Sequence, residues 1–212
     1  MKQGTSAWLV ALALLASTPA AAGNVAGNVT GDIGDRASGA RPWDEGWSFG
    51  VHAGRSIDNS VHTGEAFLPW DWDFEDYYLT SAGLRKEVAR LWRHSRVLAE
   101  MDLAWVGGDE EYAEAALTPM ITWDTFPWDR TVDTTLAVGA GLSYSSKTTE
   151  IDTIDQRWMA SMIFELEMQP AGWASWSVYT RIHHRSNAFG LFGDESSQTG
   201  SNFPSLGVRY YF

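Results

Sequence analysis

Residues 158–168 read WMASMIFELEM, and along them apolar and polar side chains alternate. Every even-numbered position is apolar, whereas the odd-numbered positions include Ser161, Glu165 and Glu167. In a β-strand successive side chains point to opposite faces, so residues two apart share a face. This stretch therefore predicts a strand with one continuous apolar face and one face that carries acids.

Seven further segments show the same period of two. Their second faces carry acids, arginines and glycines, which favours a shared charged interior. Strands with an apolar outer face of roughly ten residues and a polar inner face, in an even number, are typical of outer-membrane barrels. The expected fold is all-β, an eight-stranded antiparallel transmembrane β-barrel. The eight segments are residues 47–54, 77–88, 97–105, 113–123, 136–144, 158–168, 173–184 and 203–212.

The distribution of aromatic residues also favours the barrel. The chain has 12 Trp among 212 residues, many near segment ends, where barrels carry aromatic girdles. A water-soluble secreted β-protein such as a sandwich has the same alternation and is the alternative. Side chains fill the interior of an eight-stranded barrel, so no open pore is expected. Pro119 falls inside the fourth segment and predicts a bulge or a local break in pairing.

The beginning of the chain has the three parts of a secretory signal. Lys2 precedes an apolar run over residues 7–16, and residues 19–22 read PAAA. The run is shorter than the roughly 20 apolar residues of a spanning helix. We expect a signal peptide over residues 1–22, a flexible Gly- and Asn-rich arm over 23–45 and the barrel domain over 46–212. The expected location is the bacterial outer membrane.

Charge and composition exclude several function classes. The net charge is −12, and removal of residues 1–22, whose only charged side chain is Lys2, takes it to −13. Such an acidic chain is not expected to bind nucleic acid, which requires a basic face. The sequence contains no Cys, which excludes disulfides, thiolate metal sites and a Cys nucleophile.

A candidate catalytic pair lies at the end of the seventh segment. His184 and Ser186 are two residues apart, so a base and a hydroxyl share one strand face. Their parity is that of Trp176, on the expected lipid-facing side, near the outer rim of the barrel. A nucleophile with an adjacent base is the minimum for covalent catalysis, and a third group must orient the base. The alternative is a rim position where polar side chains meet lipid head groups.

The C-terminal part of the chain resembles a known enzyme family. Residues 184–187 read HRSN, a glycine-containing loop follows, and the last strand ends in YYF. This pattern resembles the PagL-type lipid A 3-O-deacylases, whose relatives are often labelled acyloxyacyl hydrolases. The resemblance is specific over residues 181–212, and residues 50–56 also resemble the family's first strand. It implies an outer-membrane barrel that is surrounded by membrane lipid and carries a Ser-His-Glu triad on its outer surface. The implied substrate is lipid A or lipopolysaccharide, and the implied mechanism uses no metal or cofactor.

The resemblance implies a role for each matching residue. His184 is the expected general base and Ser186 the nucleophile that attacks an acyl ester. Asn187 and backbone amides near Gly190 are expected to hold the oxyanion.

The third member of the triad has two candidates. The family keeps an acidic residue on the last strand, in phase with the final Phe. Counting back from Phe212, that position is Asn202, which is neutral. Glu195 lies in the preceding loop and is the charged candidate. An Asn can orient a His but stabilises the imidazolium less than a carboxylate does.

Two functions therefore follow from the sequence. The first is an outer-membrane esterase that removes an ester-linked acyl chain from lipid A. The alternative is a non-catalytic barrel with a structural or surface-binding role, which the neutral residue at position 202 favours. The acyl position and the oligomeric state stay open.

Overall fold

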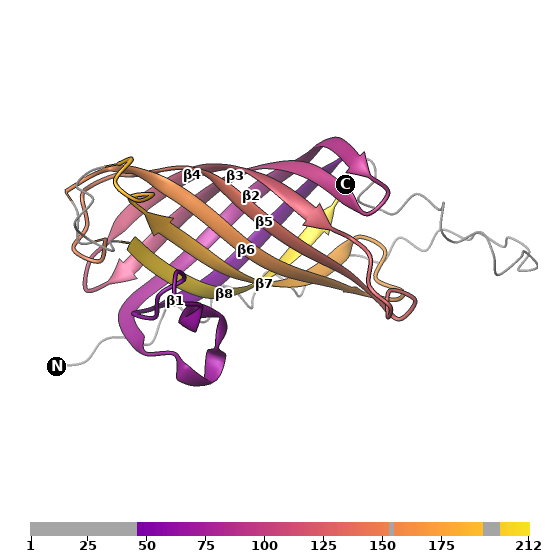
Figure 1. Cartoon of the computed structure of the whole chain (residues 1–212), viewed down its shortest axis with the longest axis horizontal. Helices are drawn as coiled ribbons and strands as arrows, with labels where there is room; N and C mark the ends of the chain where they lie inside the picture. The colour runs from indigo at the N-terminus through magenta and orange to yellow at the C-terminus, as the bar shows by residue number, and fades with distance from the viewer. Residues whose placement is uncertain (1–45, 153–154, 193–199) are drawn as a thin grey trace, which may run out of the picture. The chain divides into compact units, whose positions relative to one another are not determined.

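Eight antiparallel strands close into a barrel in chain order, with β8 paired to β1 (Figure 1). The computed structural model describes residues 46–152, 155–192 and 200–212, so the expected signal peptide and arm lie outside the described residues. The predicted fold class is confirmed. The strands are β1 (Trp47–Ile57), β2 (Phe74–Trp92), β3 (Ser95–Gly108), β4 (Tyr112–Trp123), β5 (Val132–Ser145), β6 (Trp158–Pro170), β7 (Trp176–Ser186) and β8 (Gly200–Tyr211).

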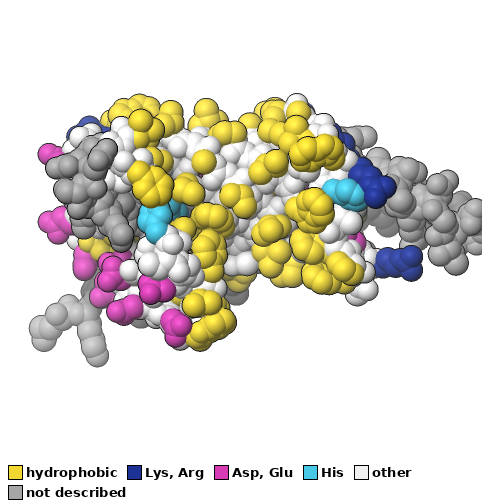
Figure 2. All heavy atoms as spheres, in the orientation of Figure 1, with side chains coloured by type: hydrophobic (Ala, Val, Ile, Leu, Met, Phe, Trp, Pro, Cys, Tyr) yellow, Lys and Arg dark blue, Asp and Glu magenta, His cyan; other side chains and the backbone are white. Residues whose placement is uncertain are grey.

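The apolar faces form the wall of the barrel and the polar faces line its lumen. β4 alternates strictly between buried and exposed residues along its whole length. Leu117 is 60% exposed whereas Glu165 is 1% exposed, the reverse of a soluble protein. Figure 2 shows hydrophobic side chains spread over the wall. This surface is the one that a bilayer covers. None of the helices in the described residues has the length and apolarity that a membrane-crossing helix requires.

Several strand limits differ from the prediction. β2 spans Phe74–Trp92, well beyond the predicted 77–88. β7 begins at Trp176 and not at residue 173, because Gly172 adopts a positive φ of 96° in the preceding turn. In β4, Pro119 causes a local break in pairing and no bulge. On the β5 side Leu117 pairs with Leu142 and Met120 with Gly139, and the two residues between them have no β5 partner. The register is the same before and after this break, so no residue is inserted.

The connections that follow β1, β3, β5 and β7 share one end of the barrel, here called the outer end. The β1–β2 loop, residues 58–73, is the longest of the fully described ones and contains η3 (Glu65–Phe67) and η4 (Pro69–Asp71). It packs on the barrel wall, where Ala66 contacts Ile57 and Ile182. The Phe67 ring lies edge-to-face on Phe164, with centroids 5.0 Å apart. Figure 2 shows acidic side chains gathered around this end.

Ion pairs fill the middle of the lumen. The Glu165 carboxylate contacts guanidinium nitrogens of Arg85 at 2.8 Å, Arg181 at 2.5 Å and Arg209 at 2.9 Å. Glu100 is a second shared acid, 2.7 Å from both Arg85 and Arg181. The predicted shared charged interior is confirmed, because Glu165 points inward and pairs with arginines from other strands.

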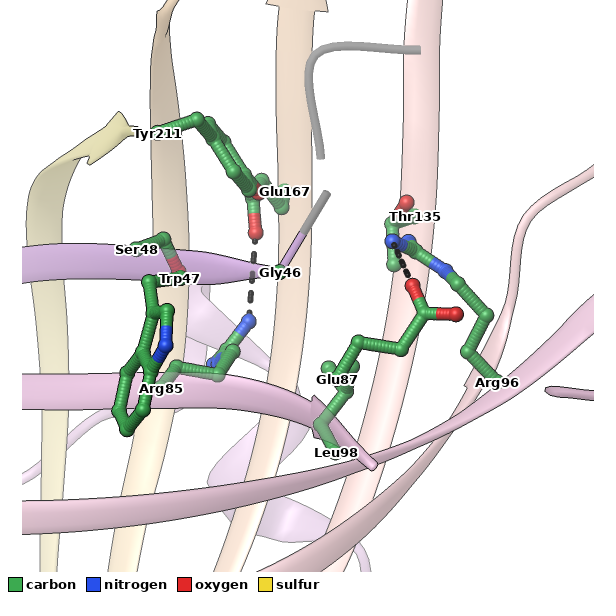
Figure 3. A pocket seen from close by; sticks show the side chains of 10 residues that line it. All are labelled: Gly46, Trp47, Ser48, Arg85, Glu87, Arg96, Leu98, Thr135, Glu167 and Tyr211. Atoms are coloured by element: carbon green, nitrogen blue, oxygen red, sulfur yellow. Dashed lines mark hydrogen bonds and ion pairs between the residues drawn. The ribbon is translucent and has the colours of Figure 1, made fainter. Parts of the chain in front are cut away.

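Ion pairs also occupy the opposite, inner end of the lumen (Figure 3). A shallow pocket there has Glu87 3.6 Å from Arg96 and Arg85 3.4 Å from Glu167. Its charged groups are thus engaged with one another, as expected for a lumen that side chains fill. Its lining also includes Trp47, Ser48, Leu98, Thr135 and Tyr211.

Candidate active site

The register of the last two strands brings His184 and Asn202 together. His184 on β7 lies directly opposite Asn202 on β8, near the outer end. Directly opposed residues of an antiparallel pair have Cβ atoms about 4.5–5.5 Å apart, so their side chains meet. Ser186 ends β7 on the same parity as His184, two residues nearer the outer end.

The side chains of His184 and Asn202 are hydrogen-bonded. The Nδ1 atom of His184 lies 2.7 Å from Oδ1 of Asn202. The amide of Asn202 is oriented by a second bond, because its Nδ2 donates to the backbone oxygen of Asn59 at 3.0 Å. With this orientation Nδ1 carries the proton, and the neutral ring presents Nε2 as an acceptor. Nε2 is buried and has no hydrogen-bond partner. The ring is therefore held as a general base requires, with its basic nitrogen free.

The β1–β2 loop covers His184, and Ser186 is buried as well. His184 and Ser186 are each only 3% exposed, although their parity is that of the lipid-facing wall. The His62 ring stands edge-on to the His184 ring, with centroids 6.0 Å apart, and lies 5.1 Å from the ring of Phe189. The expectation of direct contact with lipid at these two residues is therefore wrong. At His184 the reason is that the loop folds back along the wall and packs its apolar residues there.

Ser186 is near His184 but not bonded to it. Among the described residues, no hydrogen bond joins the Ser186 hydroxyl to the His184 ring. Residues two apart on a strand are separated by about 6.6 Å along it, a span that two side chains on one face can bridge. Catalytic hydrogen bonds are often long without substrate and shorten when it binds. The arrangement is thus compatible with a nucleophile and base that meet in the substrate complex.

The chain turns in the left-handed region directly after Ser186. Ala188, Phe189 and Gly190 have φ of 49°, 57° and 91°. Ala188 and Phe189 are the non-glycine residues with positive φ in the described part of the chain, and each such residue costs of order 1–3 kcal/mol. The backbone oxygen of Asn187 accepts from the amide of Phe192 at 3.0 Å and closes the turn. Backbone strain of this kind clusters at functional sites.

The candidate residues differ in what the structure says of them. Asn202 contacts the His184 ring, whereas Glu195 lies outside the described residues. Asn187 is buried beside the strained turn, and the oxyanion role of Asn187 and of amides near Gly190 stays a prediction.

Asn59 and His62 were missed by sequence reasoning. Both belong to an irregular loop, where strand periodicity carries no information about which residues face the site.

Comparison with known proteins gives a fold and no family. No family model matches the chain, and no curated protein matches it. The solved structure of the outer membrane enzyme PagL superposes with a TM-score of 0.52 and 15% identity, over 78% of this chain and 99% of that one. The N-terminal β-barrel domain of Pseudomonas aeruginosa OprF gives a TM-score of 0.47 at 12% identity, over 79% and 97%. The Yersinia pestis protein Ail gives 0.38 at 12% identity, over 79% and 97%. The chain thus shares the eight-stranded barrel fold of outer-membrane proteins.

Proposed function

We propose that the protein is an outer-membrane esterase that removes an ester-linked acyl chain from lipid A. Ser186 is the nucleophile, His184 the general base and Asn202 the group that orients it. The observation that carries this proposal is the 2.7 Å contact between Nδ1 of His184 and Oδ1 of Asn202, which leaves Nε2 unpartnered. The fold of the outer membrane enzyme PagL supports it further.

The reaction is a two-step acyl transfer. Nε2 of His184 takes the hydroxyl proton of Ser186 while Oγ bonds to the ester carbonyl carbon. The bond between that carbon and the sugar oxygen then breaks, and His184 returns the proton to the leaving alcohol. Water attacks the acyl-enzyme with His184 again as the base, and the fatty acid leaves. Asn202 orients the ring through both steps. It stabilises the protonated ring, the imidazolium, less than a carboxylate would.

The surroundings of the pair suit a lipid ester. His184 and Ser186 lie on the wall near the outer end, where acyl chains meet head groups in the proposed orientation. Phe189 and Leu191 in the turn after Ser186 are 82% and 77% exposed, which places two apolar side chains at the surface there. Both catalytic side chains are buried, so substrate binding requires that the ester gain access to Ser186.

Mass spectrometry of lipid A after co-expression with the protein tests this function. The unaltered chain is expected to remove one acyl chain, and Ser186→Ala and His184→Ala are expected to remove none. Thr180→Ala is the matched control, because Thr180 lies on the same strand and parity but is exposed on the wall farther from the outer end. Heat-modifiable gel migration must show that each variant folds. If the Ser186→Ala variant removes as much acyl chain as the unaltered protein, the proposal is overturned.

A non-catalytic barrel with a structural or surface-binding role is the second candidate. It is favoured by the burial of Ser186 and by the missing hydrogen bond to His184. Unchanged lipid A in cells that contain well-folded protein supports it over the esterase.

A further inference from the structure

Two histidines and an acid meet inside the lumen, on the other face of the strands from Ser186. They are His52 on β1, Asp102 on β3 and His183 on β7, all of them buried. One ligand atom of each lies within 4.8 Å of those of the other two. Ser81 donates a hydrogen bond to Oδ1 of Asp102 and fixes the carboxylate.

The two histidines each have one bonded and one free nitrogen. Nε2 of His183 donates to Glu114 at 3.0 Å, and Nδ1 of His52 lies 3.1 Å from the hydroxyl of Tyr179. Nδ1 of His183 and Nε2 of His52 are buried and have no hydrogen-bond partner. A buried polar atom without a partner costs about 1–3 kcal/mol, so two of them on neighbouring histidines favour an occupant of this cluster. Metal-bound histidines are oriented in this way, with the second nitrogen bonded to a carboxylate or another polar group.

The charge of the barrel interior also favours a cation. Among the described residues, the buried side chains include seven carboxylates and five guanidinium groups, two more negative than positive charges while the histidines are neutral. A divalent ion between the histidines and Asp102 balances both. The acids are Glu100, Asp102, Glu114, Asp124, Asp152, Glu165 and Glu167, and the arginines are Arg85, Arg96, Arg181, Arg185 and Arg209.

We propose that His52, Asp102 and His183 bind a divalent transition-metal ion of the zinc class inside the barrel. Two imidazole nitrogens and one carboxylate oxygen are the donors that such ions prefer, and a water completes four-coordination. A tetrahedral ion with bonds of about 2.0–2.1 Å holds its ligands roughly 3.4 Å apart, so the widest pair must close by at most about 1.5 Å.

Arg181 is the cation that competes for Asp102. Its Nη1 lies 3.4 Å from Oδ2 of Asp102, a long contact. The same guanidinium is 2.7 Å from Glu100 and 2.5 Å from Glu165. Arg181 therefore keeps two closer acids when Asp102 turns to the ion. The site is separate from the catalytic proposal and does not depend on it.

Metal retention by the refolded barrel tests the proposal. The chain, without a polyhistidine tag, is refolded in detergent with Zn²⁺, passed through a desalting column and analysed for metal by mass spectrometry. We expect one zinc ion per barrel and a higher melting temperature than after refolding with a chelator, because a ligand of the folded state stabilises it. Refolding with Co²⁺ should give the visible absorption of a tetrahedral site. Absence of both the retained zinc and the cobalt spectrum would overturn the proposal without any variant.

Variants locate the ion. His52→Gln and His183→Gln should each abolish retention, and Glu114→Gln should weaken Zn²⁺ affinity about 10–100-fold because it removes the partner of a ligand. His94→Gln is the control, since His94 is in the exposed β2–β3 turn and bonded to Thr125. Equal retention in His52→Gln and the control would mean that zinc binds elsewhere and contradicts the site.

Discussion

Neutralising Glu165 should destabilise the barrel more than any change of a surface charge. Glu165→Gln removes the carboxylate that Arg85, Arg181 and Arg209 share at 2.8, 2.5 and 2.9 Å. Removing one partner of a buried ion pair costs about 3–5 kcal/mol, because the other charge stays buried. The three losses do not add, since Arg85 and Arg181 keep Glu100 at 2.7 Å. We therefore expect a loss of about 3–5 kcal/mol in all.

Urea unfolding of the refolded barrel in lipid vesicles, followed by Trp fluorescence, measures this loss. The control is Asp76→Asn, which breaks a 2.8 Å pair with Arg55 in which Asp76 is 68% exposed. Such a surface pair contributes about 0–1 kcal/mol. If both variants lose the same free energy of unfolding, the lumen network does not hold the barrel together as argued.

Three further predictions address the wall, the site and its cover. Leu117→Arg places a charge on the lipid face at the middle of β4 and should cost about 2–4 kcal/mol in vesicle unfolding; no loss would contradict the membrane wall. Asn202→Glu should keep or raise lipid A deacylation, because a carboxylate stabilises the His184 imidazolium better, and a fall to background would remove Asn202 from its orienting role. Phe67→Ala should weaken the packing of the β1–β2 loop on the wall by about 0.5–1.5 kcal/mol, because the contact with Phe164 is lost. Limited proteolysis within residues 58–73 should then be faster, and an unchanged cleavage rate would show that this ring does not hold the loop.

The barrel could be predicted because its alternation is local. The acids of β6 share one face of the strand. In a membrane barrel the apolar face points outward and the polar face inward, the opposite of a soluble sheet, so Glu165 is expected to face inward. The outward face of Asn202 also follows from counting along β8 from Phe212, since a strand has a strict period of two, whereas the family resemblance singled out this residue as a partner for His184. These inferences need only the order of residues along one strand.

The cover and the lumen cluster could not be predicted for the opposite reason. His62 and His184 are far apart in the sequence, and their contact depends on how an irregular loop folds back over the wall. His52, Asp102 and His183 come from three strands, and only the closure of the barrel brings their side chains together. Periodicity tells which face a side chain occupies, but not which residues of other strands it meets there.

The proposed mechanism requires that Ser186 is a nucleophile activated by His184. A fluorophosphonate with a long alkyl chain reacts with activated serines, and peptide mass spectrometry of the treated barrel in vesicles identifies the modified residue. We expect a covalent adduct on Ser186 in the unaltered protein and none in a folded His184→Ala variant. An unmodified Ser186, or an adduct that forms equally without His184, would contradict it.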